Sequence, residues 1–348
     1  MEPNASRYLK LLSQVESFIH SPETSEDDFD SLAQKLFQHQ LANNPAYRNF
    51  CQLQKIDSIH HWQEFPALTT DTFKSKSPPT CLNLNENLVH FQTSGTTGDI
   101  KGTHYFRQTQ TYELSILQAW QQLELPSLDG HVYFLTPSAR EAPLSSLSHM
   151  METLRQKFCP QASYLISDDQ LNIAPLLEAT KQPQPIALLG TALAFLNLFE
   201  QLHSPLTLPA GSWAMETGGY KGSGRSLTKQ DLYGQFYKYL GLTKQSIWNE
   251  YSMTELSSQF YTKGIDDPHQ APHWAKIRVI DPETDKDVQA GEIGYLVIYD
   301  LANIDSICAI RTQDLAIYHH EHSFTLIGRD PSALPRGCSR SIDSSLNN

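Results

Sequence analysis

The chain has 348 residues and a formal net charge of −12 at pH 7. This charge excludes broad nucleic-acid binding, which depends on Lys and Arg side chains that neutralise phosphates. With 39% hydrophobic residues, 15 Tyr and 15 Phe, the sequence can bury a large core, so an intrinsically disordered chain is excluded as well.

The N-terminal segment, residues 1–80, is predicted to form a helical part of the core. Over residues 25–41, apolar side chains recur at helical spacing behind acidic residues, which indicates an amphipathic helix with acid at its positive end. The first residues lack the charged-then-apolar order of a signal peptide. The most apolar run, residues 186–199, is too short to cross a bilayer and fits a buried strand that leads into a helix. We therefore expect a soluble, cytoplasmic protein without a membrane span.

The middle of the chain, residues 81–272, alternates short apolar runs with helical patterns, which predicts an α/β core with parallel sheets. From residue 273 to residue 330 strands follow one another without helices, so we expect a β-rich subdomain there. Residues 331–348 are rich in Ser, Pro and Asn and are predicted to be a flexible tail. The predicted elements of the core and subdomain are helices near 108–123, 147–158 and 190–202, and strands near 132–135, 186–189, 275–280, 294–299, 307–311 and 324–327.

Residues 93–102 read Thr-Ser-Gly-Thr-Thr-Gly-Asp-Ile-Lys-Gly, after the apolar-alternating stretch 88–91. Gly95 and Gly98 let the backbone approach an anion closely, and the hydroxyls can donate to phosphate oxygens. Lys101 adds a mobile positive charge. The spacing matches neither the Walker loop nor a dinucleotide-binding loop. A nucleotide-binding loop at the end of a strand is the prediction, and a hydroxyl-rich turn without function is the alternative.

Three later segments carry groups that a nucleotidyl-transfer site requires. Tyr251 can stack on a base, while Thr254 and Glu255 offer a hydroxyl for phosphate and a carboxylate for Mg²⁺. Asp314 is predicted at the end of a strand, where its carboxylate can accept from both ribose hydroxyls, and Arg329 ends another strand nearby. Each segment alone also fits an ordinary surface turn or helix start.

The five cysteines, at positions 51, 81, 159, 308 and 338, are scattered and form no C-x-x-C pair, so the sequence suggests neither a disulfide framework nor a thiolate zinc site. The doublets His60-His61 and His319-His320 cannot aim adjacent rings at one metal and are predicted to lie on the surface.

In this order and spacing, the segments resemble the adenylate-forming superfamily of acyl- and aryl-activating ligases. That superfamily has the phosphate loop Thr-Ser-Gly-Thr-Thr-Gly-x-Pro-Lys-Gly, the base segment Tyr-Gly-x-Thr-Glu, and the ribose segments Thr-Gly-Asp and Gly-Arg. The match covers residues 88–330. Three departures concern backbone stiffness rather than chemistry: Ile100 replaces proline, while Ser252 and Gln313 replace glycine.

A narrower resemblance is to the LuxE-type acyl-protein synthetases, which activate fatty acids for bacterial bioluminescence reductases and have relatives outside luminous bacteria. It rests on the segments 190–195, 216–222, 249–261, 300–303 and 336–339. The resemblance implies the large domain of adenylate-forming enzymes. The mobile C-terminal domain of ordinary ligases is expected to be absent, because the chain ends at Asn348, soon after Arg329.

The resemblance also implies the activity. A carboxylic acid, which the resemblance indicates is a fatty acid, is converted with ATP to an acyl-adenylate. The acyl group is then transferred to a protein cysteine as a thioester. ATP and Mg²⁺ are the implied cofactors. An acyl reductase or acyltransferase subunit is the candidate partner. Two alternatives stay open: a ligase that uses an external thiol (coenzyme A or a carrier protein), and a non-catalytic nucleotide-binding subunit.

The residues implied for each role follow from the motif matches. Cys338 is the candidate acylated cysteine, since it lies on the predicted tail between Arg336 and Arg340, which would lower its pKa; a tail cysteine without a role is the alternative. The implied phosphate, nucleotide and metal groups are Thr93, Ser94, Gly95, Thr96, Thr97, Gly98 and Lys101 for the phosphates, Thr254 for the α-phosphate, Gly218, Gly219 and Tyr251 for adenine, Asp314 and Arg329 for ribose, and Glu255 for Mg²⁺.

Overall fold

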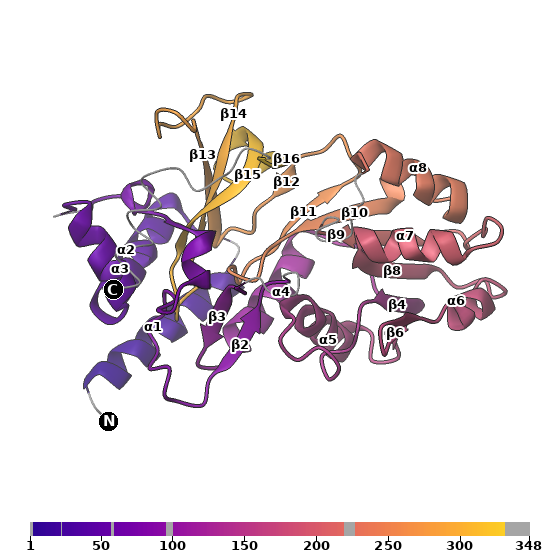
Figure 1. Ribbon diagram of the computed structural model, residues 1–348, viewed down its shortest axis with the longest axis horizontal. Coiled ribbons are helices and arrows are strands. Elements are labelled where there is room, and N and C mark those ends of the chain that lie inside the picture. Colours follow the sequence, from indigo (N-terminus) through magenta and orange to yellow (C-terminus); the bar gives the residue numbers. More distant parts are fainter. Residues whose placement is uncertain (1–2, 22, 57–58, 95–99, 219–226, 331–348) are drawn as a thin grey trace.

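The structure is a computed structural model that describes residues 3–21, 23–56, 59–94, 100–218 and 227–330 (Figure 1). It begins with three helices and short 3₁₀ segments. The bounds are α1 Pro3–His20, α2 Glu26–Asn43, α3 Pro45–Leu53, η1 Trp62–Glu64, β1 Leu68–Thr69 and η2 Thr70–Lys74. None of the helices in the described ranges is both long and apolar enough to cross a membrane.

The predicted helix over residues 25–41 is confirmed as α2, and its start has a physical cause. Ser25 and Asp28 form a capping box, in which each side chain accepts from the backbone N–H of the other residue. Asn44 then caps α3 with a bond from the Tyr47 N–H at 3.1 Å, and Pro45 occupies the first helical position. These caps fix the corner between α2 and α3.

The core of the chain confirms the predicted α/β fold class. Its elements are β2 Val89–Gln92, β3 Thr103–Phe106, α4 Gln110–Gln122, β4 His131–Leu135, α5 Ser146–Phe158, β5 Ser163–Tyr164, β6 Ile166–Ser167, β7 Gln170–Leu171, α6 Ala174–Ala179, β8 Ile186–Thr191, α7 Ala192–Gln201, β9 Trp213–Thr217, α8 Lys229–Leu240, η3 Lys244–Ser246, β10 Ile247–Tyr251, β11 Phe260–Lys263 and β12 His269–Gln270. The last strands are β13 Ala275–Ile280, β14 Ile293–Asp300, β15 Ala309–His320 and β16 Ser323–Arg329.

One large sheet runs through the molecule in the order β13-β14-β15-β16-β12-β11-β10-β9-β8-β4-β5, with β1 paired to β15. The strands from β5 to β10 are parallel, and all pairs from β10 to β13 are antiparallel. The strands β2 and β3 form a separate antiparallel hairpin. The carboxyl ends of β9 and β10 therefore lie where the parallel half meets the antiparallel half.

Alternating side chains of the parallel strands divide between two cores. On β4, Val132 and Phe134 pack with residues of α4 and α5, whereas Tyr133 and Leu135 pack with residues of α7 and α8. Both faces of the parallel half of the sheet are thus covered by helices (Figure 1), which explains the continuous apolar runs of these strands in the sequence.

The antiparallel half corrects one prediction. Asp314 was expected at the end of a strand, but it lies within β15, which continues to His320. The reason is that residues beyond Asp314 also pair with β16, through a register shift between Leu315 and Ala316. The carboxylate therefore comes from the middle of a long strand, beside an irregularity in the ladder.

Candidate nucleotide site

The segment predicted to bind phosphate connects the two strands of the β2–β3 hairpin. Its base is closed by two bonds between Thr93 and Gly102: the Thr93 N–H donates to the Gly102 carbonyl, and the Gly102 N–H donates to Thr93 Oγ1, both at 2.9 Å. Ser94 and Lys101 lie next to this base and are exposed. Gly95, Thr96, Thr97 and Gly98 lie outside the described residues.

The hairpin base contacts the segment of Thr254 and Glu255. A Cβ atom placed on Gly102 would lie 3.5 Å from Glu255 Oε1 and 3.1 Å from a methyl group of Thr93, so glycine at this position allows the carboxylate to approach the hairpin. Glu255 is only 6% exposed. The structure therefore brings together two motifs that are about 150 residues apart in the sequence.

Two buried side chains hold the backbone of this segment. The His104 ring nitrogen Nδ1 lies 2.9 Å from the Thr254 carbonyl, and Asn303 Nδ2 donates to the Glu255 carbonyl at 2.9 Å. Because a carbonyl only accepts, His104 must carry its proton on Nδ1. Burial lowers the pKa of His104 to about 4, which keeps the ring neutral near pH 7. The sequence analysis did not identify His104 as a site residue.

Tyr251 connects the base and ribose segments. Its hydroxyl donates to Asp314 Oδ2 at 2.9 Å. Burial, with the nearby Asp314 carboxylate as a second cause, raises the pKa of Tyr251 well above its usual value, so the phenol stays protonated and keeps donating. The Tyr251 ring is 7% exposed and makes edge contacts with the rings of Phe260 and Phe324.

Arg329 pairs with Asp314 across the β15–β16 ladder. Its guanidinium donates to Oε1 of Gln313, and Nε2 of Gln313 donates to Asp71 Oδ2 at 2.7 Å. Gln313, which replaces the usual glycine, thus connects Arg329, the predicted ribose residue, to η2. Within η2, Asp71 also forms an ion pair with Lys74 at 2.8 Å. Sequence reasoning noted Gln313 only as a departure and missed this connection.

The carboxyl ends of β9 and β10 carry two buried acids that the sequence analysis did not assign. Glu216 is fully buried and pairs with the Lys229 ammonium. Glu250 is 1% exposed and accepts from the Thr217 hydroxyl, and burial raises its pKa. Gly218 follows directly with φ +68°, a left-handed conformation that favours glycine. Gly219 lies outside the described residues.

The described cysteines are poor nucleophiles. Burial raises the pKa of Cys51 and of Cys159 to about 11, and it also raises the pKa of Cys81 and of Cys308. All four are free thiols. Cys338, the predicted acyl acceptor, lies outside the described residues.

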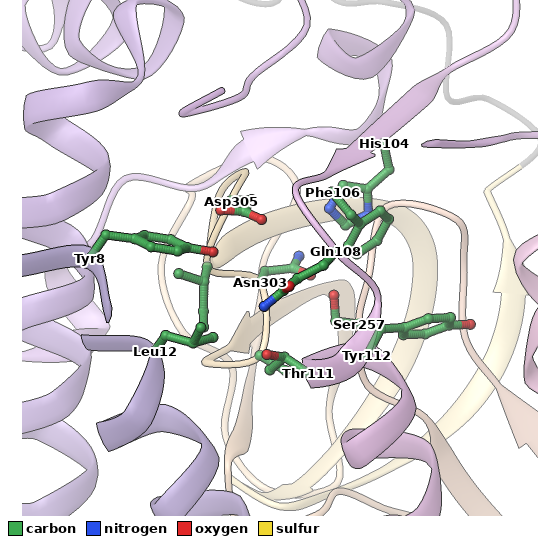
Figure 2. Close-up of a pocket in the computed structure, with 12 residues that line it drawn as sticks. Tyr8, Leu12, His104, Phe106, Gln108, Thr111, Tyr112, Ser257, Asn303 and Asp305 are labelled. Carbon is green, nitrogen blue, oxygen red and sulfur yellow. The ribbon is translucent and has the colours of Figure 1, made fainter. Parts of the chain in front are cut away.

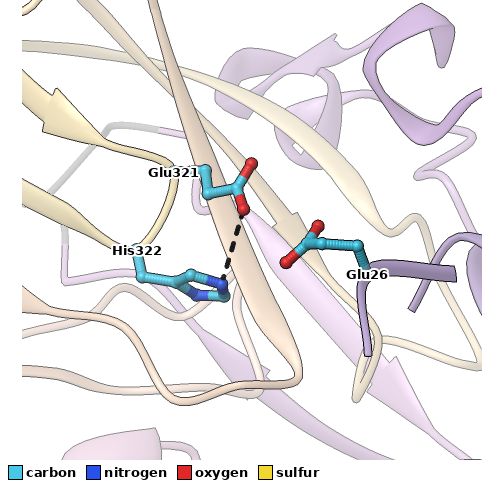
Figure 3. A group of neighbouring side chains, drawn as sticks. All are labelled: Glu26, Glu321 and His322. Atoms are coloured by element: carbon cyan, nitrogen blue, oxygen red, sulfur yellow. Dashed lines mark ion pairs between the residues drawn. The ribbon is translucent and has the colours of Figure 1, made fainter. Parts of the chain in front are cut away.

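A separate cluster of side chains offers metal-ligating atoms: Glu26, Glu321 and His322 lie within reach of one another (Figure 3). The cluster already contains a cation of the protein, because the buried Lys276 ammonium pairs with Glu26 and lies 3.2 Å from Glu321 Oε1. We therefore assign it to an ion-pair network. The exposed doublets His60-His61 and His319-His320 lie on the surface as predicted.

The described groups suit a reaction on a nucleotide phosphate. The Thr93 hydroxyl and the Gly102 backbone lie beside a buried carboxylate, Glu255, which is a hard oxygen ligand of the kind Mg²⁺ prefers. Asp314, next to Tyr251, presents a carboxylate that can accept from vicinal hydroxyls.

Comparison of the sequence with known proteins identifies the family of this chain. The family model described as "Acyl-protein synthetase, LuxE" matches residues 5–347. The chain is also similar to the long-chain-fatty-acid–luciferin-component ligase of Aliivibrio fischeri, with 24% identity over 333 residues that cover 88% of this chain and 85% of that protein.

Among solved structures, the fold is similar to that of 2-hydroxyisobutyryl-CoA ligase in complex with 2-HIB-AMP, with a TM-score of 0.65 and 13% identity over 87% of this chain and 67% of that one. It is also similar to ATP-bound MatB from Rhodopseudomonas palustris, with a TM-score of 0.51 and 13% identity over 69% of this chain. The match spans 47% of the MatB chain, about half of its length.

Proposed function

Because the chain belongs to the LuxE family of acyl-protein synthetases, we propose that it activates a long-chain fatty acid with ATP and then carries the acyl group on its own Cys338 for delivery to a partner. The name of the Aliivibrio fischeri relative supports a long-chain fatty acid as the substrate, and the ATP in the MatB structure supports ATP as the co-substrate. The external-thiol ligase and the non-catalytic subunit are the alternatives.

The first half-reaction joins the acid to AMP. A carboxylate oxygen of the fatty acid attacks the α-phosphorus, a new O–P bond forms, and the bond to the bridging oxygen breaks so that pyrophosphate leaves. Positioning and charge stabilisation supply most of the catalysis in such a transfer. In our proposal the loop from Thr93 to Gly98 and Lys101 bind the phosphates, and Thr254 donates to the α-phosphate.

The observation that carries this proposal is the contact network around Thr254 and Glu255. His104 of the hairpin bonds to the Thr254 carbonyl, a Cβ atom on Gly102 would lie 3.5 Å from Glu255 Oε1, and Tyr251, just before the pair, bonds to Asp314. We propose that the adenine lies against Tyr251 and the backbone at Gly218 and Gly219, and that Asp314 and Arg329 bind the ribose.

The residues present also fit a magnesium ion. Glu255 is a buried carboxylate beside the hairpin base, so Glu255, assisted by phosphate oxygens, would hold the ion. When bound, Mg²⁺ neutralises phosphate charge and so favours departure of pyrophosphate. The chain itself contributes the position of Glu255, which the bond from Asn303 to its carbonyl holds in place.

The second half-reaction moves the acyl group to sulfur. The Cys338 thiolate attacks the acyl carbon, a C–S bond forms, and the C–O bond to AMP breaks; the thiol proton passes to solvent. Cys338 is favoured because burial and raised pKa values make the four described cysteines weak nucleophiles. An acyl reductase or acyltransferase is the partner we propose, and the cytoplasm, where ATP is available, is the location.

Labelled fatty acid tests this function. We expect wild-type protein with ATP and Mg²⁺ to acquire a label that neutral hydroxylamine releases, as a thioester requires. Cys338→Ser should lose the label and still form acyl-adenylate, whereas the control Cys81→Ser should keep it. A label that persists in Cys338→Ser would exclude this cysteine. Transfer to coenzyme A or a carrier protein at an undiminished rate by Cys338→Ser would favour the external-thiol alternative.

A further inference from the structure

A small cavity of about 10 Å³ is lined by His104 and Asn303, the two side chains that bond to the Thr254 and Glu255 carbonyls (Figure 2). It is lined by α1, β3, the start of α4, the segment between β10 and β11, and the turn before β15. Polar residues from all of these parts line it: Tyr8, His104, Thr111, Ser257, Asn303 and Asp305. A volume of this size admits one water-sized molecule and nothing larger.

Three oxygen atoms of the lining have no hydrogen-bond partner within the described part of the chain. They are Ser257 Oγ, Asn303 Oδ1 and Asp305 Oδ1. The three residues are 0%, 1% and 8% exposed, so bulk solvent does not satisfy these atoms. A buried polar group without a partner is costly, and three at one cavity indicate a bound molecule that supplies the missing bonds.

The orientation of each acceptor is fixed by its other bonds. Asn303 Nδ2 donates to the carbonyls of Glu255 at 2.9 Å and Ile307 at 3.1 Å, so the amide cannot be flipped and its Oδ1 is left as the open acceptor. Asp305 uses Oδ2 to accept from the Arg107 N–H at 2.9 Å, and the Tyr8 hydroxyl interacts with the same carboxylate, but Oδ1 has no partner at hydrogen-bond distance among the described residues. Both open atoms are therefore acceptors that need a donor.

We propose that the cavity binds one water molecule, which donates to Asn303 Oδ1 and Asp305 Oδ1 and accepts from the Ser257 hydroxyl. The two protons and the lone pairs of water match two acceptors and one hydroxyl, and about three bonds are usual for a buried water. The water supports the Thr254–Glu255 segment, because Asn303 also holds the Glu255 carbonyl. This inference rests on the cavity alone and is independent of the proposed function.

A crystal structure of the full chain, grown in rubidium chloride and measured above the rubidium absorption edge, tests the occupant directly. We expect one density peak at hydrogen-bond distance, roughly 2.7–3.2 Å, from the three oxygen atoms and no anomalous signal. An empty cavity would overturn the proposal. A rubidium signal would also overturn it, because the occupant would then be a monovalent cation.

A pair of serine variants tests the role of the water. Ser257 and Ser306 are both fully buried with hydroxyl groups that lack partners among the described residues, but only Ser257 lines the cavity. We expect Ser257→Ala to speed amide hydrogen exchange at Glu255 and Leu256 several-fold, while Ser306→Ala leaves it unchanged. Equal exchange in the two variants would contradict the bridging role of the water, and folding of both is checked by circular dichroism.

Discussion

The hydroxyl of Tyr251 donates to Asp314 Oδ2 at 2.9 Å, although 63 residues separate the two in the sequence. This bond joins the end of β10 to the middle of β15, across the boundary between the parallel and antiparallel halves of the sheet. It fixes the proposed ribose carboxylate relative to the proposed adenine segment, so the two can bind one nucleoside together.

The first prediction concerns this bond. Tyr251→Phe removes the hydroxyl and leaves the ring, so we expect KM for ATP to rise roughly 3- to 10-fold with little change in kcat, the size of one net hydrogen bond. Acid-dependent pyrophosphate exchange at varied ATP measures both. Tyr237→Phe, on the exposed face of α8, is the control. An unchanged KM in Tyr251→Phe would show that the bond does not position Asp314 for ATP.

Gln313 is predicted to stabilise the position of Arg329. Gln313→Ala should weaken ATP binding a few-fold, because the arginine loses its bond to Oε1 and β15 loses its bond to Asp71. A double-mutant cycle with Asp71→Ala should give a coupling free energy of about 1 kcal/mol in urea unfolding, as expected for residues in one network. A coupling free energy of zero would show that the Gln313 and Asp71 side chains do not interact in solution.

Lys101 is predicted to contribute charge but not the framework of the loop. Lys101→Ala should raise KM for ATP about 5-fold, because one exposed cation is lost while the backbone donors remain. The increase in KM caused by Lys101→Ala should be smaller at high salt, since exposed charges are screened. Lys181→Ala, an exposed lysine after α6, serves as control. An effect that is equal in both variants would exclude Lys101 from the site.

His104 is predicted to make the protein sensitive to acid. Its pKa is about 4 in the folded state and 6.5 as the ordinary value, so the unfolded chain binds the proton first as pH falls. Stability is therefore lost between pH 6.5 and pH 4, by on the order of 3 kcal/mol from this residue. His104→Asn cannot titrate.

Urea unfolding at two pH values measures this effect. His104→Asn should be less stable than the wild type at pH 7, and the difference should shrink by about 2 kcal/mol at pH 5. Burial also lowers the pKa of His269, to about 3. The loss of stability expected from His269 at low pH is the same in the wild type and in His104→Asn, so it cancels in the difference. A difference that does not change with pH would show that His104 is not held neutral.

The sequence predicted those elements whose signals are local. The acidic start and apolar spacing of α2 and the apolar run of β8 and α7 both lie within one segment, and the structure confirms them. Residues 1–80 were expected to be helical, but α1 was not predicted as an element of its own, although Leu11, Val15 and Ile19 are buried at helical spacing and could have revealed it.

The rest depends on contacts between distant segments. His104 and Thr254 are 150 residues apart, and Asn303 and Glu255 are 48 apart, so no local pattern could reveal that these side chains hold the site backbone. The position of Asp314 within β15 depends on pairing with β16, including a register shift that spacing does not encode. Motif matches identified which groups to examine, but only the fold shows what supports them.

The central claim, acid-dependent formation of an acyl-adenylate at Glu255, is tested most directly by exchange of labelled pyrophosphate into ATP. We expect exchange that requires a long-chain fatty acid in the wild type, in Cys338→Ser and in the surface control Glu178→Gln, and a loss of at least about 100-fold in folded Glu255→Gln, which removes the charge and keeps the volume. Exchange at the wild-type rate in Glu255→Gln, or no fatty-acid-dependent exchange in the wild type, would contradict the account.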